Sequence, residues 1–238
     1  QKEVSQFFSS ITGYLAIAVF LILMALITFV FPETSAFAAN YATLDSFFNA
    51  APYALLFLIP AVTMSLFAEE RSAQTLELLF TKPVSLPQVI IGKYLASVLI
   101  VFLALLPTLL FVFILSNLSE PQNNLDYGGI AGSYIGLFLL GAGFCAIGVF
   151  ASSLPKNQIV AFLIAVFFCF AMYFVFTSIS QLPWVYGKVD YLIQQFGMET
   201  HYNSLSRGVI DSRSIIYFLS VIVIFLWLTT VSLTLNRS

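Results

Sequence analysis

The chain has 238 residues, of which 60% are hydrophobic and 8% are charged, and its formal net charge is −2. A soluble domain is about 45–50% apolar and about 25% charged, so this composition cannot cover a water-exposed surface. A soluble enzyme, a nucleic-acid-binding protein and a disordered tail are therefore excluded, and no basic surface for nucleic acid is present. What remains is a protein that crosses a membrane several times.

An amphipathic helix is predicted at the start of the chain, over residues 1–11. Val4, Phe7, Phe8 and Ile11 recur at helical spacing among polar residues, which is typical of a helix lying in the membrane interface. The alternative is that this segment is the frayed beginning of the first span, because helix boundaries are poorly defined by sequence.

Six apolar runs follow, each about as long as the 20 residues that a helix needs to cross a bilayer. None contains Asp, Glu, Lys, Arg or His, which disfavours an ion-coupled transporter or an intramembrane aspartyl protease. The sequence therefore predicts an all-α, polytopic membrane protein of one domain over residues 1–238. The predicted spans are Gly13–Phe31, Ala50–Phe67, Leu95–Ser116, Ile130–Ala151, Gln158–Ser180 and Ser214–Leu235.

Basic residues predict the orientation, because cytoplasmic loops are enriched in Lys and Arg. The loops 32–49 and 117–129 hold neither, whereas the opposite side carries Lys2, Arg71, Lys82, Lys93, Lys156 and Arg237. Both termini are therefore predicted to be cytoplasmic. The protein is expected in the cell inner membrane. Loop 181–213 disagrees, since it holds the three remaining basic residues yet lies outside in this topology.

The stretch after the second span, residues 68–93, is predicted to begin with a helix that continues the span out of the membrane. Glu70, Gln74, Glu77 and Thr81 share one helical face. Neither glutamate has a basic residue at i+4, so counter-charges are expected from water or from another chain. For Glu69, Glu70 and Arg71 taken singly, the alternative is an ordinary solvated loop.

A sharp elbow is predicted to follow this helix. Pro83 forces Lys82 out of the helical region, which ends the first helix. Ser85 and Gln88 have the spacing of a capping box that starts a new helix, and Pro87 is tolerated in the first turn.

Two further features lie at the outer side of the membrane. Val189, Leu192, Ile193 and Phe196 have helical spacing and predict a short amphipathic or re-entrant helix. The polar run after it is consistent either with a functional segment or with an ordinary wet loop; it contains His201, Arg207, Asp211 and Arg213.

Glycines spaced by four predict close helix packing in the fourth span, within the subunit or between subunits. They are Gly128, Gly132 and Gly136.

Motifs for nucleotide and metal chemistry are absent from the sequence. Gly92 and Lys93 are followed by Tyr94, so the Walker A pattern fails, and a single histidine excludes an H-E-x-x-H site. We therefore expect no catalytic residue, no metal site and no cofactor bound by this chain.

The segment FAEERSAQTLELLFTKPVSLPQVIIGKYLA resembles the cytoplasmic coupling region of ABC-2 type transporter permeases. Their pattern is an E-x-x-x-x-T-x-E-L-L run, then P-V-S, then G-K before the third span. Six spans, an N-terminal amphipathic helix and an outer helix before the last span also match. The matching residues are Glu70, Thr75, Glu77, Leu78, Leu79, Pro83, Val84, Ser85, Gly92 and Lys93.

This resemblance implies a partner that supplies the energy. It implies a cytoplasmic ABC ATPase that holds ATP and Mg, a second permease subunit in a homodimer or heterodimer, and surrounding membrane lipid. Val189, Leu192, Ile193 and Phe196 would form an outer gate. The interface with the ATPase would comprise Glu69, Glu70, Arg71, Gln74, Thr75, Glu77, Lys82, Pro83, Val84, Ser85 and Gln88.

A narrower resemblance concerns the two ends of the chain. FFSSITGYLAIAVF and HYNSLSRGVIDSRSIIYFLS are similar to the permease of the gliding-motility ABC transporter of Bacteroidetes. This implies a second, larger membrane subunit with an outer domain. The alternatives are a generic ABC-2 exporter of unspecified substrate, a membrane-embedded enzyme, and a channel or scaffold that acts without an ATPase.

Overall fold

The computed structural model describes residues 11–31, 36, 43–74, 85–119, 125–183, 187, 189–208 and 211–235. All regular secondary structure in these residues is helical. Six helices are long and apolar enough to cross a membrane, which confirms the predicted all-α, six-span fold. They are Gly13–Val30, Asp45–Ser72, Leu86–Leu118, Tyr127–Ser153, Gln158–Ser180 and Ser212–Leu235.

Several spans consist of more than one helical element. Pro107 lies in a short 3₁₀ turn that interrupts the third span, as expected where proline removes a backbone donor. The elements are α2 (Ile11–Ala25), η1 (Leu26–Val30), α3 (Asp45–Thr63), α4 (Ser65–Ser72), α6 (Leu86–Leu105), η2 (Leu106–Thr108), α7 (Leu109–Leu118), α8 (Tyr127–Ser153), α9 (Gln158–Phe170), η3 (Ala171–Val175), α10 (Phe176–Ser180), α11 (Asp190–Gln194), α12 (Met198–Ser206) and α13 (Ser212–Leu235).

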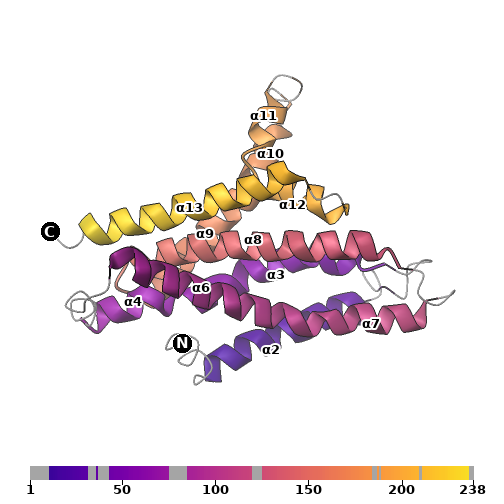
Figure 1. The fold of residues 1–238 in the computed structure, drawn as a ribbon, viewed down its shortest axis with the longest axis horizontal. Coiled ribbons are helices and arrows are strands. Elements are labelled where there is room, and N and C mark those ends of the chain that lie inside the picture. The colour runs from indigo at the N-terminus through magenta and orange to yellow at the C-terminus, as the bar shows by residue number, and fades with distance from the viewer. Residues whose placement is uncertain are drawn as a thin grey trace.

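The central helix of the fold is α8, which packs against α3, α4, α6, α9, α12 and α13 (Figure 1). In its most apolar stretch 78% of the residues are buried, against 22–33% in the first, third, fifth and sixth spans. Its glycines allow this position, because small residues let helix backbones approach closely. At Gly148 even a Cβ atom would overlap the Thr63 side chain of α3.

The outer helices present large apolar side chains to their surroundings. Such a belt is stable only in hydrocarbon, because soluble monomers rarely expose wide apolar patches. Exposed members include Leu15, Ile22, Leu110, Phe113, Phe167, Val223 and Trp227.

The two ends of the helix bundle differ. One end, called here the α4 end, carries α4, the beginning of α6 and the end of α13 (Figure 1). The other, called the α12 end, carries the end of α7, the beginnings of α3 and α8, and α12. Helices α10 and α11 project sideways from the bundle (Figure 1).

The predicted helix after the second span is shorter than expected. It ends at Ser72, and Gln74 has a φ of 56°, a left-handed conformation that is typical of helix ends. Gln74 therefore does not continue the face that begins at Glu70. The rest of the predicted elbow, residues 75–84 with Thr75, Glu77, Lys82, Pro83 and Val84, lies outside the described residues, as does the amphipathic segment 1–10.

Candidate coupling site at the α4 end

The first turn of α4 is capped by a side chain from α8. The Oγ of Ser152 accepts hydrogen bonds from the N–H groups of Phe67 and Ala68 at 2.9 and 3.2 Å, and donates to the carbonyl of Met64 at 3.0 Å. The first N–H groups of a helix have no partner within it, so they must be satisfied from outside. Ser152 thus serves as an N-cap supplied by another helix.

The last turn of α4 is attached to the same helix. Nη1 of Arg71 donates to the carbonyls of Ser153 and Leu154, the latter at 2.8 Å. These carbonyls lie at the C-terminal end of α8, where cations are favoured because the last carbonyls lack partners and carry partial negative charge. α4 is therefore tied to the end of α8 by both its first and its last turn.

Lys93 of α6 forms the third attachment. Its side chain is buried, with 3% exposed. Nζ donates to the carbonyl of Leu66 at 2.7 Å and to Oε1 of Glu70 at 2.9 Å, and lies 5.1 Å from the centroid of the Phe67 ring. A buried ammonium group requires such partners, because its desolvation is otherwise costly.

The Glu70–Lys93 pair corrects the expectation about counter-charges. We predicted that the charge of Glu70 is balanced by water or by another chain, whereas Lys93 of the same chain pairs with it. The i+4 rule examines one helix only and does not detect a partner on a different helix. α6 also begins at Leu86, upstream of the predicted span, which brings Lys93 into the packed helix.

The remaining described residues of the predicted interface flank segment 75–84. Ser85 precedes α6, and its N–H donates to Oε1 of Gln88 at 3.1 Å, as the predicted capping box requires. Ser85, Gln88 and Gln74 are exposed, and Glu69 is half-buried. Ser152 is absent from the predicted site, because a serine near the end of an apolar helix carries no sequence signal of its contacts.

The predicted outer helix is short. α11 covers five residues, with Val189 just before it and Phe196 beyond it. Val189, Leu192 and Phe196 are 47%, 62% and 63% exposed, and Ile193 is half-buried. Gly197 separates α11 from a second helix, α12, which the sequence pattern did not predict.

Much of the polar run after α11 is packed rather than wet. His201 of α12 is buried, with Nε2 3.0 Å from the carbonyl of Gln195 and Nδ1 3.2 Å from Oγ of Ser214. Its ring stacks on Tyr217 at a centroid distance of 4.0 Å. Tyr202 donates to the carbonyl of Phe48 at 2.7 Å, and burial raises the pKa of this phenol above its ordinary value. Of the charged residues in the run, Arg207 and Arg213 are exposed and Asp211 is half-buried.

The glycines of α8 bring α12 close to the central helix. A Cβ at Gly132 would lie 2.8 Å from the carbonyl oxygen of Leu205, and one at Gly136 would lie 3.0 Å from Cβ of Leu205. Both glycines therefore serve packing within this chain. Gly128 is exposed, and its backbone lies beside Gly208, just after the end of α12.

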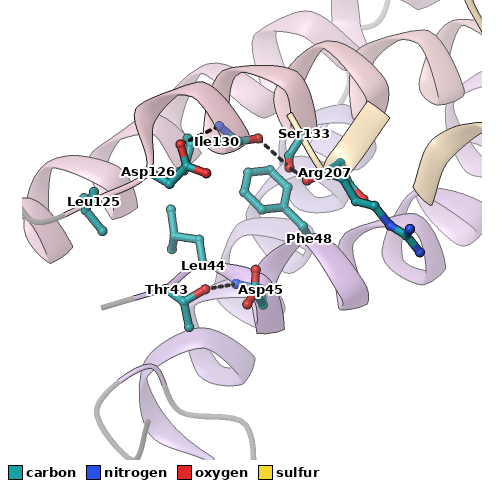
Figure 2. Close-up of a pocket in the computed structure, with 11 residues that line it drawn as sticks. Thr43, Leu44, Asp45, Phe48, Leu125, Asp126, Ile130, Ser133 and Arg207 are labelled. Carbon is teal, nitrogen blue, oxygen red and sulfur yellow. Dashed lines mark hydrogen bonds between the residues drawn. The ribbon is translucent and has the colours of Figure 1, made fainter. Parts of the chain in front are cut away.

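A pocket of about 140 Å³ lies between α3, α8 and α12 (Figure 2). Its two carboxylates belong to Asp45 and Asp126, and Asp126 caps α8 by accepting from the N–H of Gly129 at 3.0 Å. Arg207 lines the pocket, but its guanidinium group points away (Figure 2). No cluster of three potential metal ligands occurs in the described part of the chain.

These features define a multi-pass α-helical membrane protein whose polar contacts gather at the ends of the helices. The family model of ABC-2 family transporter proteins matches residues 31–231, and the chain belongs to this family. It is accordingly a non-catalytic membrane permease of an ABC transporter, and such permeases generally work with a cytoplasmic ABC ATPase. No curated protein sequence matches the chain.

Proposed function

We propose that this chain is the permease subunit that couples ATP hydrolysis by a separate cytoplasmic ATPase to transport or force transmission across the inner membrane. The observation that supports this most directly is the attachment of α4. Ser152, Arg71 and Lys93 hold it to α8 and α6, so a force on the connection between α4 and α6 would act on the packed helices. The excess of basic residues supports a cytoplasmic location for the α4 end and both termini.

The ATPase would bind the elbow around Lys82–Gln88. Exposure of Gln74, Ser85 and Gln88 on either side of segment 75–84 supports this assignment. Because Glu70 is paired with Lys93, the acidic residues assigned to the interface are Glu69 and Glu77. ATP and Mg would be held by the ATPase.

A second permease subunit would complete the transporter, and the exposed apolar residues at Val189–Phe196 would contribute to the outer gate. The similarity of the chain ends to a gliding-motility permease favours a role in gliding, with a larger partner that has an outer domain. A generic ABC-2 exporter is the alternative, and it too would bind its ATPase at the α4 end.

Charge reversal at Glu77 tests the proposal. Glu77→Lys should leave the permease inserted but lower its affinity for the ATPase by roughly 30-fold or more, because like charges would meet at a partly desolvated contact. The measurement is co-purification of the ATPase, followed by ATP turnover.

Asn203→Lys, which also introduces a lysine but at an exposed position of α12 far from this segment, is the control and should retain the ATPase. Normal assembly and turnover in Glu69→Lys/Glu77→Lys would contradict the proposed interface.

A further inference from the structure

We propose that α8 carries movement of α4 to α12 at the other end of the bundle. Ser152 and Arg71 are the positioning residues that attach α4 to α8. The inference rests on the proposed function, because it assumes that the ATPase acts on the segment that follows α4. It adds to that function the route by which the movement crosses the membrane.

The first step is the break between α3 and α4. Met64 separates the two helices, and the buried hydroxyl of Ser152 bonds to three backbone groups at this break. A side chain inserted into the helical hydrogen-bond ladder is a common cause of a kink. α4 is therefore joined to α3 through an interrupted ladder, whereas it is bonded to α8 at both of its ends.

α8 is long and continuous enough to connect α4 with α12. It is one α-helix of 27 residues without a proline, which corresponds to about 40 Å. The other neighbours of α4 do not offer such a connection. The second span is broken at Met64. The third span, which Lys93 attaches to α4, is interrupted by the 3₁₀ turn η2, and the fifth passes through the π-helical turn η3.

The third step is the contact of α8 with α12. The carbonyl of Leu205 faces Gly132 so closely that no Cβ fits, and Oγ of Ser133 lies 3.0 Å from the carbonyl of Ser206. Closely packed backbones shift together, because protein interiors contain little free volume. His201 then links α12 to the end of α11 through the carbonyl of Gln195.

Ser152→Ala and Ser153→Ala form a matched pair of variants. Both serines are fully buried at the end of α8. The hydroxyl of Ser153, however, contacts Phe150 and Ser232 and does not contact α4. Each variant therefore removes one buried hydroxyl, but only the first removes the cap of α4.

The experiment uses the full chain with its ATPase in lipid nanodiscs, where added reagents reach both faces of the membrane. Asn203→Cys, at an exposed position of α12, is the reporter. The native Cys145 and Cys169 are buried. A membrane-impermeant maleimide measures the labelling rate with and without a non-hydrolysable ATP analogue. Ser152→Ala should reduce the nucleotide-dependent change in rate by roughly threefold or more, with the ATPase still bound, while Ser153→Ala should preserve the change.

Hydrogen exchange provides a local readout. In Ser152→Ala the amide of Phe67, in the first turn of α4, should exchange faster because its acceptor is gone, whereas Ser153→Ala should leave it protected. If Ser152→Ala does not insert, Arg71→Met tests the second attachment with the same reporter, and Arg71→Lys should restore most of the response.

The outcomes separate the inference from the proposed function. A full response of the reporter in Ser152→Ala, or in Arg71→Met, contradicts the inference. A labelling rate of Asn203→Cys that does not change with nucleotide, in an otherwise wild-type permease with bound and active ATPase, also contradicts the inference. Failure of the wild-type permease to retain any ATPase contradicts the proposed function instead.

Discussion

A single lysine shows how this protein accommodates charge near the membrane. Lys93 is buried, but it donates to a carbonyl and a carboxylate, and its ammonium group lies over an aromatic ring. Removing one partner of a buried ion pair is costly, whereas replacing both is often nearly neutral. The pair therefore fixes where α6 meets α4 more than it adds to stability.

We expect Lys93→Met to lower the free energy of unfolding by about 3 kcal/mol, because it removes the cation beside Glu70. Lys93→Met/Glu70→Gln should recover most of this loss. Thermal unfolding of the solubilised permease measures both, with Lys156→Met at an exposed position as control. Equal stability of all three variants would show that the pair is only peripheral.

Among the elements, α8 depends most on its small residues. Gly148 and Thr63 mark the crossing of α8 and α3, and no larger residue fits there without displacement of the two helices. Two of the glycines that we predicted from spacing, Gly132 and Gly136, face Leu205 of α12. The backbone of Gly128 lies beside Gly208, just after α12.

Gly148→Ala should destabilise the permease by about 1–3 kcal/mol, as expected for overpacking. Gly92→Ala is the matched control, because an added Cβ there meets nothing within 4 Å and alanine favours the helix. Unfolding in a denaturing detergent compares the two. A loss in Gly92→Ala as large as that in Gly148→Ala would refute the packing argument.

For the whole molecule, the basic residues and the arrangement of the ends make one prediction. Ala73 and Asn203 are both exposed. Ala73 directly follows α4 and Asn203 belongs to α12, and these helices lie at opposite ends of the bundle (Figure 1). In intact cells, Asn203→Cys should react with a membrane-impermeant maleimide, and Ala73→Cys should react only after the membrane is permeabilised. The opposite pattern would invert the topology and place the coupling segment outside.

The sequence alone was sufficient for the six spans, the capping box at Ser85 and Gln88, and the resemblance to ABC-2 permeases. Each depends on hydrophobic length, local spacing or a short motif, and these are properties of neighbouring residues. The length of α4 was predicted incorrectly, because a periodic pattern does not reveal where the backbone turns left-handed, as it does at Gln74.

Only the tertiary structure decided which polar groups form the candidate site. Glu70 and Lys93 are 23 residues apart, and Phe67 and Ser152 are 85 apart. Their meeting depends on how the helices pack, and for Phe67 and Ser152 on the close crossing of α8 and α3 at Gly148. The same is true of His201, which has the composition of a wet loop but becomes buried because α12 packs on α8 and α13. Hydrophobic length determines that a helix enters the membrane, but side-chain volume at the crossings determines its neighbours.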